Sequence, residues 1–268
     1  MIVRIVVAAV GLAVLLPILV FGGELGLELL VPVVLLVCID EYARMAFPEA
    51  RATANVALTA GIAVPYVTAL YVGDRLLLPL GGLAVVAAMT LVVLRPGADL
   101  SRAADALGRW TLGVAWFGST FVFLPLLRRL DDGLAWVFVA MALAWLSDTG
   151  GYFAGRFFGR TPLHPAVSPK KTVEGLVGGL LAATTGVAVI RAVALPALSI
   201  VDVVAIGLGV GALGVVGDLA ESLLKRAYGV KDSGTLLPGH GGLLDRIDAL
   251  MFVCTGLYGY IILRLGYG

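Results

Sequence analysis

Long apolar runs with almost no charged residues restrict how this chain can fold more than any other feature. Of its 268 residues, 60% are hydrophobic and 14% are charged, and the mean hydropathy is +1.02. A soluble domain this apolar could not cover its surface with polar groups, whereas about 20 apolar residues cross a hydrocarbon core as one helix. The chain is therefore predicted to be an all-α, polytopic transmembrane helix bundle of about nine spanning helices. The predicted spans lie near residues 2–21, 25–39, 55–72, 76–94, 111–127, 133–148, 173–195, 199–218 and 249–264.

The Lys and Arg residues indicate how these spans are oriented. If the chain has nine spans, most of the 19 lie in segments on one side of the membrane. Loops that stay in the cytoplasm carry such an excess of Lys and Arg. We therefore expect residues 148–172 and 218–248 to form cytoplasmic catalytic loops within a C-terminal part, 133–268, and residues 1–132 to form a scaffold of helices. The net charge of +1 gives no basis for binding nucleic acid.

The segment from Asp218 to Asp248 concentrates charge at the ends of two predicted spans. If the eighth helix continues through residue 226, one of its faces carries two acids, a hydroxyl and a cation at helical spacing. These are Asp218, Glu221, Ser222 and Lys225. Asp245 and Asp248 share a face at the start of the ninth helix, where a helix N-terminus favours phosphates. Ionisable groups beside hydrocarbon are costly and usually functional, although charges that merely pair at the interface are the alternative.

The acids of this segment suit magnesium better than zinc. The chain has two histidines, His164 and His240, and its two cysteines, Cys38 and Cys254, lie in apolar runs. Carboxylates with few other ligands favour Mg²⁺, which takes its remaining oxygens from water and substrate phosphates. Asp148, at the end of the sixth span, is either a further ligand or an interfacial acid.

A second anion site is predicted at the start of the seventh span. Ser168 followed by Pro169 has the pattern of a helix N-cap with proline at the first helical position. Lys170, Lys171 and Thr172 then occupy the first turn and offer N–H groups and ammonium groups to an anion. Ordinary lysines of a cytoplasmic loop are the alternative.

The stretch SLLKRAYGVKDSGTLLPGHGGLLDRID, from Ser222 to Asp248, resembles the complete signature of the phosphatidate cytidylyltransferases, or CDP-diacylglycerol synthases. The upstream segments DTGGYFAGR and SPKKTVEG are also similar, and the resemblance extends over about residues 145–260. It implies a membrane enzyme that converts CTP and phosphatidate to CDP-diacylglycerol and pyrophosphate with Mg²⁺, and a second cation is possible. It further implies a multi-pass protein of the cell inner (plasma) membrane with its active-site loops in the cytoplasm. Its partners would be the two substrates and the lipid bilayer, and a homodimer is possible.

The resemblance also implies roles for individual residues. The expected metal ligands are Asp218, Asp245 and Asp248, and Lys225 and His240 complete the expected catalytic group. The expected substrate-binding residues are Ser168, Lys170, Lys171, Thr172, Ser222, Arg226, Lys231, Asp232 and Arg246.

Two rival functions use the same residues. A related CTP-dependent enzyme could act on another lipid, as CDP-archaeol synthases and polyprenol or phytol kinases do. An ion transporter could use the charged cluster as an ion path, but that function predicts charges near mid-membrane and broken helices repeated in two halves. The charges of this chain instead gather at the ends of the spans.

Overall fold

The computed structural model describes residues 2–94, 99–239 and 241–266, and helices dominate it. The N-terminal helices are α1 (Ile2–Phe21), α2 (Gly23–Ala46), α3 (Arg51–Tyr71), η1 (Asp74–Leu76), α4 (Leu77–Val93), α5 (Leu100–Thr120) and α6 (Phe123–Arg129). They are followed by α7 (Gly133–Phe158), β1 (Pro162–His164), β2 (Ser168–Thr172), α8 (Val173–Ala194), α9 (Ile200–Val204), η2 (Ala205–Val210), α10 (Gly211–Ala227), α11 (Leu244–Tyr260) and η3 (Ile261–Leu265). The prediction of an all-α membrane bundle is confirmed.

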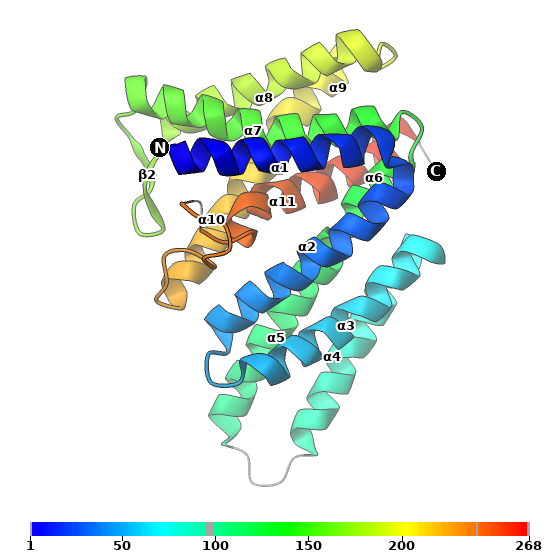
Figure 1. Ribbon diagram of the computed structural model, residues 1–268, viewed down its shortest axis with the longest axis vertical. Coiled ribbons are helices and arrows are strands. Elements are labelled where there is room, and N and C mark those ends of the chain that lie inside the picture. Colours follow the sequence, from blue (N-terminus) through cyan, green and yellow to red (C-terminus); the bar gives the residue numbers. More distant parts are fainter. Residues whose placement is uncertain (1, 95–98, 240, 267–268) are drawn as a thin grey trace. The chain divides into compact units, whose positions relative to one another are not determined.

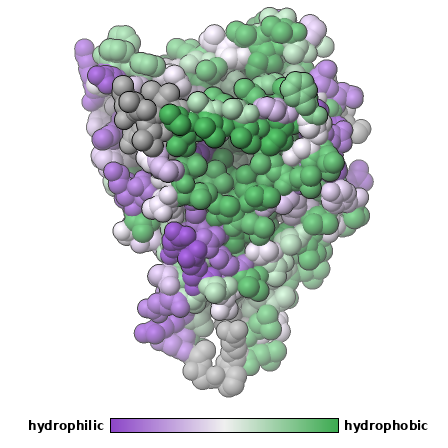
Figure 2. Space-filling model, in the orientation of Figure 1, coloured by the Kyte–Doolittle hydropathy of each residue, from purple (hydrophilic) through white to green (hydrophobic). Residues whose placement is uncertain are grey.

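Six of the described helices are long and apolar enough to cross a membrane. They span Arg51–Tyr71, Leu100–Arg129, Gly133–Phe158, Val173–Ala194, Ile200–Ala227 and Leu244–Leu265. Shorter apolar helices cover Ala9–Phe21 and Pro79–Leu91. Many large apolar side chains are exposed, and they occupy much of the face seen in Figure 2, as expected where helices meet hydrocarbon. The count of nine spans stays a prediction.

The chain divides into two compact units. One unit, Glu28–Val122, is built on α3, α4, α5 and most of α2. Its core holds the fully buried Tyr42, whose ring meets Phe117 edge-on at a centroid distance of 5.5 Å. The Tyr42 hydroxyl donates to the carbonyl of Arg109 at 2.7 Å, so this buried phenol has a hydrogen-bond partner.

The other unit comprises Met1–Leu27 and Phe123–Gly268 and carries the charged segments. Its helices α7 and α8 run side by side (Figure 1). Glycines bring the two backbones together, because a Cβ atom on Gly151 would lie 3.3 Å from the carbonyl oxygen of Gly175. Such contacts between small residues let helices pack closely in a membrane.

Two predicted boundaries change in this unit. Helix α7 continues to Phe158, ten residues beyond the predicted end of the sixth span, so the first part of the expected 148–172 loop is helical. The predicted N-cap at Ser168 is wrong, because Ser168–Thr172 forms strand β2, which pairs antiparallel with β1. Helix α8 starts at Val173, and its N-cap is Thr172, whose hydroxyl accepts from the N–H of Gly175 at 3.0 Å.

Pairing with β1 explains the error. The backbone from Ser168 to Thr172 is held extended by the antiparallel ladder, so it cannot also form the first helical turn. Lys170 and Lys171 therefore lie on a strand, and the anion site expected from their helix N–H groups is not formed there.

Candidate functional site

The candidate site lies where α10, the loop residues 228–239 and 241–243, and α11 meet strand β2. The expectation that the eighth helix continues through residue 226 is confirmed, because α10 ends at Ala227. Helices α10 and α11 approach each other at Gly217, where a Cβ atom would lie only 2.8 Å from the carbonyl oxygen of Asp248. A larger residue at 217 would push the helices apart. This close approach brings the acids of the two helix ends into one region.

A buried lysine links the two helices. The Lys225 ammonium group on α10 forms ion pairs with Glu221 one turn earlier and with Asp245 on α11, the latter at 2.5 Å. Lys225 is 8% exposed and Glu221 is 1% exposed. Buried charges are stable only when they are paired and hydrogen-bonded, so this network fixes α10 against the start of α11.

Asp245 also holds the loop between the helices. Its Oδ2 accepts from the N–H of Ser233 at 2.9 Å, the hydroxyl of Ser233 at 3.0 Å and the N–H of Gly242 at 2.8 Å. Gly241 has a φ of +85°, and a Cβ atom there would lie 2.7 Å from the same Oδ2. The loop can fold over this carboxylate because position 241 is glycine. Asp245 therefore organises the loop through Oδ2, while its Oδ1 pairs with Lys225 on α10.

Asp218 connects α10 to strand β2. It forms an ion pair with Lys171, and its Oδ1 accepts from the Ser222 hydroxyl at 3.3 Å. The side chains of Lys171 and Asp218 are 28% and 24% exposed. The ion pair therefore lies at the edge of the site rather than within the core.

Two further acids face Asp218. The charges of Asp218 and Asp148 both act on the Asp248 carboxylate, and the charge of Asp218 acts on Asp148. Asp248 is buried, with Oδ1 accepting from the N–H of Ala249 at 2.7 Å. Among the described residues, neither Asp148 nor Asp248 has a cation within ion-pair distance. Of the three interacting carboxyl groups, only Asp218 has an ion pair among the described residues, and the set includes Asp148, whose role the sequence left open.

Glu174 fixes the base of the hairpin that carries Lys171. Its carboxylate accepts from the backbone N–H groups of Arg160 at 3.1 Å and Thr161 at 3.2 Å. The N–H of Val173 donates to the carbonyl of Thr161 at 2.9 Å. The hairpin is thus tied to α8 at its base and to α10 through Lys171.

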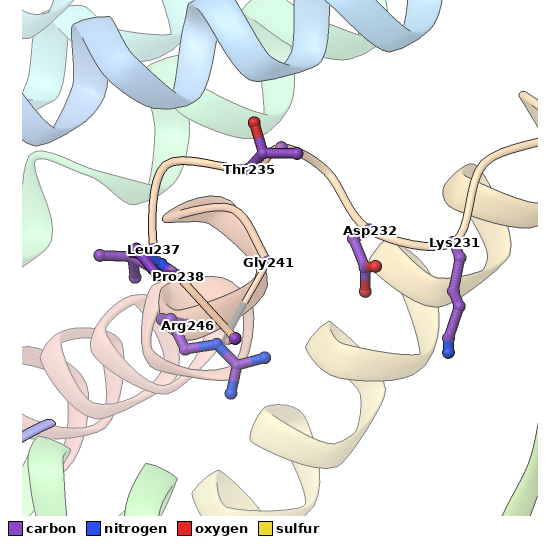
Figure 3. A pocket seen from close by; sticks show the side chains of 9 residues that line it. Lys231, Asp232, Thr235, Leu237, Pro238, Gly241 and Arg246 are labelled. Carbon is purple, nitrogen blue, oxygen red and sulfur yellow. The ribbon is translucent and has the colours of Figure 1, made fainter. Parts of the chain in front are cut away.

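A polar cavity of about 610 Å³ lies beside the network. It is lined by Lys231, Asp232, Gly234, Thr235, Leu237, Pro238, Gly239, Gly241 and Arg246. Figure 3 shows Lys231 and Asp232 extending from the loop near α10, and Arg246 extending from the first turn of α11. The cavity has the size of a small-molecule site, and two cations with glycine backbone are suited to a phosphorylated ligand.

The structure brings most of the predicted residues together. Arg226 lies at the end of α10 and donates to the carbonyl of Val230 at 2.9 Å, so it shapes the loop. Ser168 and Lys170 lie on β2, away from the helix start expected for them. His240 lies outside the described residues.

Three contributors were not predicted as site residues. They are Glu221, Ser233 and Glu174. The spacing of Glu221 and Lys225 placed them on one helix face, which the structure confirms with an ion pair, but Glu221 was not assigned a role in the site. No local pattern marks the other two, because their partners are set by the folded loop and hairpin.

The oxygen donors of the site suit a hard cation. Within the described ranges, no group of three or more His, Cys, Asp or Glu side chains is arranged to hold a metal ion. Mg²⁺ is usually held by one or two carboxylates together with substrate phosphates, rather than by a cage made only of protein ligands. The neighbouring carboxyl groups of Asp148, Asp218 and Asp248 supply oxygen donors of the kind that such a cation uses.

Comparisons with known proteins agree with this picture. Residues 2–263 match the model of the cytidylyltransferase family. A Bacillus subtilis protein named phosphatidate cytidylyltransferase is 42% identical over 155 residues, which are 58% of each chain. Proteins of the same name from Staphylococcus saprophyticus and Staphylococcus aureus are 42% and 41% identical over 53% of this chain and 54% of their own lengths. The chain thus spans just over half the length of these curated relatives.

Proposed function

We propose, from the premise that this chain belongs to the cytidylyltransferase family, that it transfers the cytidylyl group of CTP to phosphatidate and releases pyrophosphate. One observation carries the proposal: the described residues of the signature segment, 222–239 and 241–248, form a single site. In it, acids linked through Lys225 lie beside a polar cavity whose lining includes Lys231, Asp232 and Arg246. The curated relatives with the name phosphatidate cytidylyltransferase support the same substrates.

The proposed chemistry places few demands on a general base. A phosphomonoester has a second pKa of about 6, so phosphatidate is largely a dianion at neutral pH. One of its oxygens attacks the α-phosphorus of CTP, the bond from that phosphorus to the β-phosphate bridging oxygen breaks, and pyrophosphate leaves with the electron pair. The protein must neutralise two polyanions and hold them in line.

The cavity supports a role in holding phosphates. Lys231 and Arg246 line it and are exposed to solvent, so an anion can reach both. We propose that they bind the triphosphate of CTP, with His240 as a further donor. Lys225 is buried between Glu221 and Asp245, which supports a role in fixing the site.

The acids support a role for Mg²⁺. A bound divalent cation would neutralise charge on the α-phosphate and on the departing pyrophosphate. Asp218 and Asp248 are proposed as its ligands, and Asp148 is a third candidate because all three charges interact. Asp245 is kept as a proposed ligand as well, and in this structure its oxygens accept from Lys225, Ser233 and Gly242. A second cation stays a possibility within this proposal.

The membrane setting fits a reaction between a soluble nucleotide and a lipid. The site lies at the C-terminal end of one candidate span, Ile200–Ala227, and at the N-terminal end of another, Leu244–Leu265. We propose that this end faces the cytoplasm of the inner (plasma) membrane, where CTP is present, and that a homodimer is compatible with the fold.

Incorporation of labelled CTP into a chloroform-soluble product tests the function. Purified full-length protein with Mg²⁺ should give organic-phase label only when phosphatidate is added. Absence of label with folded protein, with both Mg²⁺ and Mn²⁺ tried, would overturn the proposal. A panel with archaeol-type and polyprenol lipids would then test the related CTP-dependent activities, and ion flux in proteoliposomes would test transport.

A further inference from the structure

We infer that Lys171 is the internal counter-ion of Asp218 in the ligand-free enzyme, and that a divalent cation must displace it. The inference rests on the proposed function, because it takes Asp218 as a cation ligand. The inference adds a role for Lys171 on strand β2: when the cation binds, this lysine exchanges one ion-pair partner for another.

The ion pair uses the carboxylate that the cation needs. The Lys171 ammonium group lies on Oδ2 of Asp218, and the Ser222 hydroxyl donates to Oδ1 at 3.3 Å. Both oxygens are therefore engaged. Mg²⁺ requires contact at about 2.0–2.1 Å to its oxygen ligands, and an ammonium group on the same oxygen repels it.

The position of the pair makes the exchange feasible. Both side chains are about one quarter exposed, so the ammonium group can leave its partner without being stranded away from water. The hairpin base is held independently through Glu174, whose carboxylate binds the N–H groups of Arg160 and Thr161. Release of Lys171 therefore requires a change of side-chain rotamer and leaves the hairpin anchored.

The displaced lysine gains a new partner when substrate is present. A phosphate that arrives with the cation supplies oxygens to an ammonium group, which binds phosphate as a point charge. Lys171 would thus pair with carboxylate before the cation binds and with phosphate afterwards. Without a nucleotide, however, Lys171 only opposes the cation.

Cation affinity in the absence of both substrates tests the inference. Free Mn²⁺, followed by electron paramagnetic resonance, would be titrated into the full chain in detergent. Lys171→Met and Lys171→Gln both remove the competing charge, and each should tighten Mn²⁺ binding by about tenfold. Lys170→Met is the matched control, because Lys170 is the exposed neighbour on the same strand. It should change the affinity by about twofold or less, since exposed charges are screened.

Asp218→Asn separates the inference from the function on which it rests. If this variant binds Mn²⁺ as the wild type does, Asp218 is not a cation ligand, and the inference and the proposed ligand role of Asp218 both fail, whereas the transferase function is tested separately by CTP incorporation. If Asp218→Asn weakens binding while both Lys171 variants bind as the wild type, the inference alone fails. If Lys170→Met tightened Mn²⁺ binding by the same amount, the inference would also be overturned. The effect would then come from the loss of any nearby positive charge and not from removal of the competing ion pair.

Discussion

Two carboxylate networks in this chain are built on opposite principles. In the unit Glu28–Val122, Asp40 accepts from Arg51 at 2.6 and 2.8 Å, from Arg44 at 3.2 Å and from Asn55 at 2.7 Å. We call this set the Asp40 clasp. It joins α2 to α3, and its donors satisfy both oxygens of the one carboxylate. In the candidate site, Lys171 and Lys225 form ion pairs with three acids, Asp218, Glu221 and Asp245. Among the residues that the structure describes, the neighbouring Asp148 and Asp248 have no such pair.

The difference separates a structural charge from a functional one. In the Asp40 clasp, arginines of the chain itself neutralise the carboxylate. The clasp therefore needs no ligand. The candidate site instead holds Asp148 and Asp248 without an ion pair among the described residues, and a polar cavity lies beside it. Acids that the fold does not neutralise call for a ligand, and buried ionisable groups of this kind are typical of functional sites.

The largest effect is expected at the acids that are proposed to bind the cation. Asp218→Asn and Asp248→Asn should each lower kcat/KM by at least about 10²-fold, because a neutral amide binds a divalent cation poorly. Labelled-CTP incorporation measures the loss, and size exclusion in detergent shows whether the fold is kept. Asp105→Asn, an exposed acid on α5, is the control and should retain full activity. Wild-type activity in either site variant would place the cation elsewhere.

Substitutions of Lys225 and Asp245 should have non-additive effects on activity, because the two residues belong to one network. Lys225→Met leaves two buried acids without their shared cation, and Asp245→Asn weakens the hold on the loop at Ser233 and Gly242. Each should cost activity by about 10–100-fold, as groups that support a site do. The double variant should cost little more than the worse single one, because residues in one network are not additive. Strict additivity would show that the two act independently.

A smaller effect is expected at the cavity wall. Lys231→Gln and Arg246→Gln should raise KM for CTP by about tenfold with little change in kcat, since each removes one charge that binds the ground state and the transition state alike. The loss should diminish at high salt, where exposed charges are screened. Initial rates over a range of CTP and salt concentrations measure both. A fall in kcat at unchanged KM would instead place these residues at the reacting phosphorus.

Local patterns predicted those parts of the molecule that depend on one helix. Hydropathy indicated the all-α class, and spacing along α10 placed Asp218 beside Ser222, which the structure confirms with a hydrogen bond. The expectation that Asp245 begins the ninth helix is also confirmed. Which of these residues bind metal or substrate stays a prediction.

Long-range packing determined the rest. The bridge from Lys225 to Asp245 depends on the approach of two helices at Gly217, which no spacing within one helix reveals. The hairpin was missed because strands of three and five residues have too few positions to show an alternating pattern. With the hairpin missed, the partnership of Lys171 and Asp218 could not be foreseen.

The smallest effect is expected in the Asp40 clasp, and it should fall on stability and not on turnover. The Arg51 guanidinium lowers the pKa of the Asp40 carboxyl from 3.8 to about 2, and Asn55 and Arg44 contribute to the same shift. A carboxyl whose pKa is lower in the folded state stabilises the fold above its unfolded pKa, and this contribution is lost as pH falls from about 4 towards 2. Because Asp40 is partly exposed, solvent screening limits the contribution to about 0.5–1 kcal/mol.

Asp40→Asn should therefore lower the apparent Tm at pH 7 by about 1–3 °C and leave kcat/KM within about twofold. The Tm difference from the wild type should shrink between pH 4 and pH 2, where the wild type loses the same charge. Glu49→Gln removes a charge from the exposed turn between α2 and α3 and should change neither quantity. A Tm difference that persists at low pH would mean that Asp40 acts through shape rather than charge. A loss of activity as large as that of Asp248→Asn would end the distinction between the two networks, because it would make the Asp40 clasp part of the catalytic apparatus.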